Sequence, residues 1–152
     1  MKDIDKRLLE LGITIPDIQP PLANYVPAKR SGNLVFTAGQ VCALGGKIIK
    51  GKLGREIDLE TGKEATRLCM INCLAAIKKL LGSLNDIKEI IAVHGLINSV
   101  PEFSGQADVM NGASDLIVQI FGQNGRHTRT AVGVASLPHD FAASVYIIVE
   151  VN

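Results

Sequence analysis

The segment GRHTRTAVGVAS, residues 125–136, sets two arginines and a histidine against small and β-branched residues. If residues 129–136 form a strand, alternate side chains share a face, which places Arg129 beside Ala131, Gly133 and Ala135. The opposite face is β-branched and suited to packing. A guanidinium beside small residues leaves room for a ligand, and its planar fork fits a carboxylate or a phosphate. The alternative is an arginine at the end of a strand that makes a structural salt bridge.

Other polar side chains are weaker candidates for chemistry. Arg126 and His127 precede the predicted strand in a glycine-containing loop, and we expect both to face water. His94 lies in a mostly apolar segment, which favours a hydrogen-bonded core histidine, and His139 is expected in an exposed turn. The sequence has no Ser-x-x-Lys, Gly-x-Ser-x-Gly or P-loop motif. No complete nucleophile and base set is predicted, so any catalysis would depend on water, backbone groups and binding energy.

The three cysteines, Cys42, Cys69 and Cys73, do not have zinc-type spacing. Cys69 and Cys73 are four residues apart in a predicted helix, with no histidine or further cysteine near them in the sequence. Packing in the core is the better interpretation, and free thiols fit a reducing cytoplasm. We therefore expect no metal, no cofactor and a cytoplasmic location.

The charge balance argues against nucleic acid and membranes as partners. The 152 residues include 16 basic and 15 acidic side chains, for a net charge of +1, so no broad basic face is predicted. The N-terminal segment MKDIDKRLLELG is charged, unlike a signal peptide, and no apolar run of about 18 residues occurs.

The hydrophobic pattern predicts one α+β domain over residues 1–152. A short helix is expected over residues 3–11, and the proline-rich segment IPDIQPPLANYVPA after it is expected to be a loop. NLVFTAGQV is predicted to be a strand, with GGKII as its hairpin partner. The later elements are helices at 61–81 and within 103–121, and strands in KEIIAVHGLINS, TRTAVGVAS and AASVYIIVEV. This order predicts a mixed sheet with two long helices on one face. The apolar strand KEIIAVHGLINS is expected to be covered on both sides.

Two segments resemble the RidA/YjgF family of reactive-intermediate (enamine/imine) deaminases. ANYVPAKRSGNLVFTAGQV is similar to the family's GPYSQAV..G.LVY.SGQ segment, with matches at Tyr25, Gly32, Gly39 and Gln40. RTAVGVASLP is similar to the family's RS.V.V..LP signature, with matches at Arg129, Val132, Val134, Leu137 and Pro138. The resemblance covers nearly the whole chain. The N-terminal extension, residues 1–19, and the segment NGASDLIVQIFG resemble a longer branch that is often labelled endoribonuclease.

The resemblance implies a chorismate-mutase-like fold, assembled as a homotrimer with ligand sites in clefts between subunits. Arg129 would hold the carboxylate of a small 2-imino or enamine acid such as 2-aminoacrylate, and water would attack the imine carbon to give a 2-keto acid and ammonia. Tyr25 would line the cleft and the Gly39 backbone would contact the substrate. Asn111 corresponds to the family's helix asparagine, with a difference of one residue in its spacing to Arg129.

Several positions depart from the family pattern. The acidic residue that typically positions the water is replaced by Ser144, and the frequent cysteine of the substrate site by Ala131. A second acid is replaced by Tyr146, and Glu150, the acid that is left on this strand, lies far along it. Ser144 can hydrogen-bond a water but cannot act as a carboxylate base.

Three hypotheses follow. The first is a deaminase in which Arg129 anchors the substrate and Ser144 or backbone groups hold water. The second is a non-catalytic carboxylate-binding or regulatory trimer. The third is an endoribonuclease or translation inhibitor, against which the neutral charge argues.

Overall fold

The computed structural model describes residues 3–152, so the first two residues of the predicted domain (1–152) and of the predicted extension (1–19) lie outside it. The helices are α1 (Ile4–Glu10), α2 (Leu59–Leu81) and α3 (Gln106–Phe121), with short 3-10 turns η1 (Leu84–Asp86), η2 (Gly122–Gly125) and η3 (Pro138–Asp140). The strands are β1 (Ala28–Ser31), β2 (Leu34–Thr37), β3 (Gln40–Val41), β4 (Ala43–Leu44), β5 (Lys47–Ile48), β6 (Ile87–Asn98), β7 (Thr128–Val134) and β8 (Ala143–Val151). None of the helices in this range is long and apolar enough to cross a membrane.

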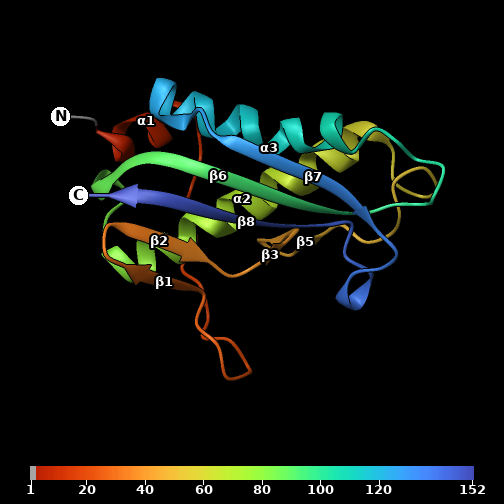
Figure 1. Ribbon diagram of the computed structural model, residues 1–152, viewed down its shortest axis with the longest axis horizontal. Helices are drawn as coiled ribbons and strands as arrows, with labels where there is room; N and C mark the ends of the chain where they lie inside the picture. Colours follow the sequence, from red (N-terminus) through yellow and green to blue (C-terminus); the bar gives the residue numbers. More distant parts are fainter. Residues whose placement is uncertain (1–2) are drawn as a thin grey trace.

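The main sheet has the strand order β1-β2-β8-β6-β7. β3 pairs with the part of β8 that β2 does not reach. β6 and β7 are parallel, and α3 is the connection between them. The other pairs of this sheet are antiparallel. The predicted α+β fold with a mixed sheet is therefore confirmed. β7 lies at the edge of the sheet, beside α3 (Figure 1).

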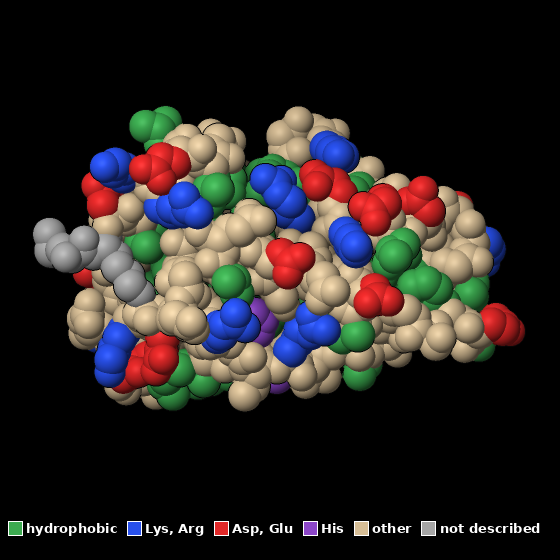
Figure 2. Space-filling view, turned by 90° about the horizontal axis from the view of Figure 1, so that it is seen from above, with side chains coloured by type: hydrophobic (Ala, Val, Ile, Leu, Met, Phe, Trp, Pro, Cys, Tyr) green, Lys and Arg blue, Asp and Glu red, His purple; other side chains and the backbone are tan. Residues whose placement is uncertain are grey.

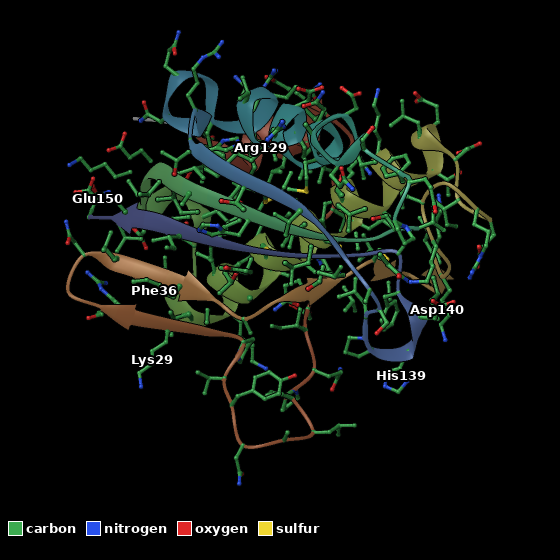
Figure 3. The ribbon with its side chains drawn as sticks, turned by 45° about the vertical axis from the view of Figure 1, so that its right-hand side comes forward. Lys29, Phe36, Arg129, His139, Asp140 and Glu150 are labelled. Atoms are coloured by element: carbon green, nitrogen blue, oxygen red, sulfur yellow. The ribbon has the colours of Figure 1, made fainter. Side chains whose placement is uncertain are left out.

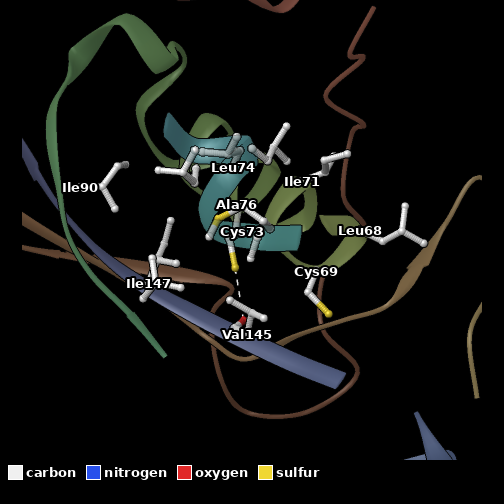
Figure 4. Close-up of a cluster of buried hydrophobic side chains, with 14 of the residues drawn as sticks. Leu68, Cys69, Ile71, Cys73, Leu74, Ala76, Ile90, Val145 and Ile147 are labelled. Carbon is white, nitrogen blue, oxygen red and sulfur yellow. Dashed lines mark hydrogen bonds between the residues drawn. The ribbon is translucent and has the colours of Figure 1, made fainter. Parts of the chain in front are cut away.

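α2 and α3 pack on one face of the sheet, as predicted, and the core lies between these layers. α2 contacts β8 on one side and α3 on the other, which explains why its middle turns are buried almost all round. The core is built from aliphatic side chains and thiols (Figure 4). Cys73 Sγ donates to the Val145 carbonyl at 3.2 Å, and burial raises the pKa of the Cys73 thiol to about 12.

All three cysteines are free and buried, which confirms that they pack in the core. Within residues 3–152, no cluster of histidine, cysteine, aspartate or glutamate side chains is arranged to hold a metal ion.

The other face of the sheet is open in a single chain. Phe36 of β2, Val132 of β7 and Tyr146 of β8 are 41%, 42% and 37% exposed. His94 of β6 stacks on Tyr146 with ring centroids 4.6 Å apart. The prediction that residues 88–99 are covered on both sides is therefore wrong for one chain, because both helices pack on the same face. His94 is a half-buried residue of the open face and not a core histidine.

The N-terminal strands differ from the prediction. NLVFTAGQV is broken into β2 and β3, because the chain leaves β2 after Thr37 and rejoins β8 further along. GGKII forms its hairpin with β4 and not with NLVFTAGQV. β1, which begins at the last residue of the predicted loop, pairs with β2 and was not predicted.

Candidate functional site

Arg129 lies on β7 with its side chain directed toward α3. Its partner in the parallel β6–β7 register is Val93, a fully buried residue of the helix-covered face. Nη1 of Arg129 donates to Asn111 Oδ1 at 2.8 Å and is 3.3 Å from Ser114 Oγ, and both acceptors belong to α3. The structure thus brings together Arg129 and Asn111, two residues that the sequence singled out. None of the ion pairs within residues 3–152 includes Arg129.

His127 lies next to this pair, at the entrance to β7. Its Nε2 is 2.9 Å from Ser114 Oγ, and its Nδ1 is 2.6 Å from the Gly125 carbonyl oxygen. A carbonyl oxygen can only accept, so Nδ1 carries the proton and Nε2 of the neutral ring accepts from the serine hydroxyl. The prediction that His127 simply faces water is wrong, because two hydrogen bonds hold the half-buried ring in place. Arg126 is exposed, as predicted.

Two glycines allow the close packing that positions these side chains. A Cβ on Gly112 of α3 would overlap the Lys63 carbonyl oxygen of α2. A Cβ on Gly125 would lie 2.5 Å from the Ile117 carbonyl oxygen. α3 therefore approaches both α2 and the turn before β7 at backbone distance. This approach places Asn111 and Ser114 within reach of Arg129 and His127.

The cluster opens on a surface cavity of about 340 Å³ that is lined by Ser114, Asp115, Val118, Arg126, His127 and Arg129. Two guanidinium groups and one carboxylate thus border it, which favours a small anion. In Figure 2, which views the molecule from above, a partly covered histidine lies between basic side chains, and acidic side chains are interspersed over the same face. The visible charges form a local basic site and not a broad basic surface.

The other predicted site residues lie elsewhere in the chain. Ser144 pairs with Leu96 and Val41 on the open face of the sheet, and a Cβ on Gly39 would lie 2.9 Å from Ser144 Oγ. Tyr25 is in the loop before β1 and is 58% exposed. One chain therefore joins Gly39 to Ser144 but holds this pair on the opposite face of the sheet from Arg129. Ala131 follows Arg129 on the helix-covered side of β7, opposite Gly95.

Glu150 is not placed to act as a base for Arg129. Lys88 Nζ donates to Glu150 Oε1 at 3.0 Å, and Asn33 Nδ2 donates to the same oxygen at 2.9 Å. The hydrogen bond from Lys88 is the main reason that the pKa of Glu150 is lowered. Figure 3 shows Glu150 and Arg129 well apart, with Glu150 at the end of β8.

A larger cavity of about 540 Å³ lies where β7 ends and α3 begins, and its lining includes Lys52, Arg55, Ser99, Phe103 and Gln106. Lys52 Nζ donates to Asn98 Oδ1 at 2.6 Å and to the Ala135 carbonyl oxygen. Arg55 pairs with Glu56. Sequence reasoning missed this cavity, because its lining residues come from three separate segments and share no motif.

Comparisons of the sequence and of the structure with known proteins agree on one family. Residues 5–151 match the family model described as "YjgF/chorismate_mutase-like, putative endoribonuclease". Protein TCP17 of Trypanosoma cruzi is 38% identical over 95% of this chain and 92% of its own length. The crystal structure of Atu1372 from Agrobacterium tumefaciens has a TM-score of 0.90 with 44% identity, over 98% of this chain and 93% of that one. A structure from Shewanella oneidensis, named as an endoribonuclease, has a TM-score of 0.93 with 32% identity, over 99% and 100%.

Proposed function

Because this chain belongs to the YjgF/chorismate-mutase-like family, we propose that it hydrolyses small 2-imino or enamine carboxylates to 2-keto acids and ammonia. The observation that carries this proposal is the state of Arg129. Both of its hydrogen bonds come from Nη1 and go to neutral side-chain oxygens. Among the described residues its Nε–Nη2 edge therefore has no partner, and this edge fits a bidentate carboxylate.

The chemistry needs little beyond a positioned substrate and water. In a 2-imino acid the imine carbon is bonded directly to the carboxylate carbon. A carboxylate held by Arg129 therefore fixes the reactive carbon close to the guanidinium and over the adjacent cavity. Imines hydrolyse readily in water, so orientation of the two reactants supplies much of the acceleration. No cofactor or metal is needed for this reaction.

We further propose that the active species is a homotrimer with its sites between subunits. Arg129 is exposed on an edge strand, whereas Gly39 and Ser144 border the open face of the sheet. In a closed ring of three chains, the Gly39–Ser144 region of one chain would face Arg129 of the next. Tyr25 of that neighbouring chain would line the same cleft. The three buried free thiols fit a reducing compartment such as the cytoplasm.

A specific observation favours a second function, that of a non-catalytic carboxylate-binding trimer. Ser144 and Tyr146 stand where the family resemblance places acids, and neither is a base at neutral pH. Endoribonuclease activity, which the family description names, has less support. The net charge of +1 provides no general attraction for a phosphate chain, and the candidate site holds one histidine.

The test is the rate of 2-aminoacrylate and 2-iminobutyrate hydrolysis, with semicarbazide trapping the residual imine. We expect the wild-type protein to accelerate hydrolysis and Arg129→Ala to lower kcat/KM by roughly 10- to 100-fold, the loss of a charged hydrogen-bonding partner. Lys52→Gln, which removes a cation from the larger cavity, is the matched control and should keep the activity.

The other outcomes separate the candidates. Saturable binding of a 2-keto acid without turnover, abolished by Arg129→Ala, would favour the non-catalytic binder. Loss of activity in Lys52→Gln but not in Arg129→Ala would move the site to the larger cavity. RNA binding that weakens steeply with salt would favour a nucleic-acid partner.

A further inference from the structure

We infer that His127, acting through Ser114, is the general base that activates the attacking water. This inference rests on the proposed deaminase function and names the group that the sequence did not supply. The family resemblance leaves the water-handling position with Ser144, which has no basic group. The structure places an imidazole nitrogen, an acceptor in the neutral ring, two hydrogen bonds away from Arg129 on the same chain.

The hydrogen bonds form a chain in which each donor meets an acceptor. Arg129 Nη1–H donates to Ser114 Oγ at 3.3 Å, Ser114 O–H donates to His127 Nε2 at 2.9 Å, and His127 Nδ1–H donates to the Gly125 carbonyl oxygen at 2.6 Å. The carbonyl fixes the tautomer and the orientation of the ring. A hydroxyl, a base within hydrogen-bond reach of it, and a third group that orients the base are the elements of an activated proton acceptor.

The position of Ser114 fits this role. Its hydroxyl is a neighbour of the guanidinium that is proposed to hold the substrate carboxylate. The imine carbon is one bond from that carboxylate, so the substrate would extend into the cavity that Ser114 also lines. A second water in this cavity would join the attacking water to Ser114 Oγ. His127 and Ser114 also line the same 340 Å³ cavity as Arg129. The pair therefore borders the same cavity as the proposed substrate and would reach the attacking water through that second water.

The reaction is balanced as follows from the iminium form, which an enamine substrate reaches by taking up a proton from water at its β-carbon. The water oxygen bonds to the iminium carbon while the C=N π electrons move to nitrogen. The water proton passes through the second water to Ser114 Oγ as the serine proton passes to His127 Nε2, which leaves a neutral carbinolamine and an imidazolium. The imidazolium returns the proton by the same route to the amine nitrogen. The C–N bond then breaks, the hydroxyl proton is taken up through Ser114 by His127, and the C=O bond forms. His127 finally releases this proton, so the products are a 2-keto acid and ammonium.

Charged side chains lie close to His127 around the cavity. Arg126 and Arg129 border the cavity from the β7 side, and Asp115 borders it from α3. A general base must be unprotonated to accept the water proton. Activity should therefore fall as pH is lowered across the range of the assay below. The arginines remain charged throughout the range, so they do not account for such a loss.

The experiment compares His127→Asn, Ser114→Ala and His139→Asn in the imine assay from pH 5 to 9. Asparagine at 127 keeps a donor for the Gly125 carbonyl but has no basic nitrogen. We expect kcat to fall by roughly 10²- to 10⁴-fold in His127→Asn, as for loss of a general base, with KM changed much less. Ser114→Ala should show a similar loss. In both variants the residual rate should lose the wild-type decline at low pH. His139 is exposed in a turn, and its variant should match the wild type.

The outcomes distinguish this inference from the proposed function. If the folded wild-type protein does not accelerate imine hydrolysis, the proposed function fails and this inference falls with it. If the wild type is active but His127→Asn and Ser114→Ala keep its rate and pH profile, only this inference is overturned. A further Ser144→Ala variant then tests the neighbouring chain as the source of the water site. If His127→Asn does not fold, the Ser114→Ala rate and pH profile decide alone.

Discussion

Arg129 and Arg55 carry the same guanidinium group, but their neighbours give the two charges different uses. Arg55 Nε donates to Glu56 Oε2 at 2.6 Å and Nη2 donates to Oε1 at 3.0 Å, so its fork is filled by a carboxylate. Arg129 is held by a neutral amide and a hydroxyl. An anion at Arg55 must compete with Glu56, whereas an anion at Arg129 displaces water. The smaller cavity is therefore the better carboxylate site, although the other cavity is larger.

The Arg55–Glu56 pair makes a direct prediction about titration. The hydrogen bonds from Arg55 lower the pKa of Glu56 to about 2, well below an ordinary glutamate pKa of about 4.3. A carboxyl with a lowered pKa contributes stability above its unfolded-state pKa and loses it as pH falls toward the folded value. Because both side chains are exposed, this contribution is small and screened by salt.

In a carboxyl-carbon NMR titration, Glu56 should remain ionised below pH 3. Arg55→Gln should raise its pKa toward the ordinary value, while Arg67→Gln, which removes another arginine near a glutamate, should not. An unchanged Glu56 titration in Arg55→Gln would contradict the assignment.

At the scale of elements, the packing of α3 on α2 determines where the site residues lie. Gly112 sits between Asn111 and Ser114, directly against the Lys63 carbonyl of α2. Thr66 of α2 reinforces this contact, since its hydroxyl lies 3.0 Å from the Lys63 carbonyl oxygen and 2.8 Å from that of Val109 in α3. A side chain at residue 112 would have to push the two backbones apart.

We therefore expect Gly112→Ala to destabilise the fold, although alanine is the better helix former. Overpacking of a dense contact typically costs about 1–3 kcal/mol of folding stability. Replacing glycine by alanine in a helix gains at most about 1 kcal/mol, so we expect the cost to exceed the gain. The displaced helix should also weaken Arg129-dependent turnover. Urea unfolding measures the first effect and the imine assay the second. Gln119→Ala, at an exposed position of α3, should stay within about 0.5 kcal/mol of the wild type. A Gly112→Ala protein as stable as the wild type would show that the helices can separate freely.

The elements that the sequence predicted well are those with local signals. α2 and α3 have apolar side chains at helical spacing and end at Gly82 and Gly122, and β6, β7 and β8 are apolar or β-branched runs of sufficient length. The break between β2 and β3 was not predictable, because it depends on pairing with β8 about a hundred residues later. A strand's partner is not encoded in its own periodicity.

The site residues also divide into those with a signal in the sequence and those that only the packing brings together. Arg129 stood out because small residues surround it, and Asn111 because of the family resemblance. The Ser114–His127 pair was missed, since no spacing rule relates a residue in the middle of a helix to one in the following turn. Only the crossover from β6 through α3 to β7 and the close contact at Gly125 bring the two together. The donor–acceptor pattern becomes visible once this packing is known.

At the scale of the whole molecule, the open face of the sheet exposes several large apolar side chains in a single chain. Phe36, Val132 and Tyr146 lie on three strands of one sheet, with His94 stacked against Tyr146. A contiguous exposed apolar face indicates an interaction surface. Gly39 and Ser144, which are proposed to complete the site of a neighbouring chain, border this same face. We therefore expect the site to be complete only in the assembled trimer.

A mixed assembly tests whether each site draws on two chains. Arg129→Ala removes the carboxylate anchor, and Ser144→Phe should block the cleft that the neighbouring chain completes. Each variant alone is expected to keep at most about a tenth of the wild-type activity while remaining assembled, which light scattering checks. If the variants are unfolded together in equal amounts and refolded, half of the chains carry an intact Arg129. Half of their neighbours carry an intact Ser144, so roughly a quarter of the clefts of a cyclic trimer should be fully intact. Imine hydrolysis should recover to about that share of the wild-type rate.

If each site lies within one chain, every site contains a mutation and mixing restores no activity. That result would retain Arg129 as the anchor but remove Ser144 and Gly39 of a neighbouring chain from the site.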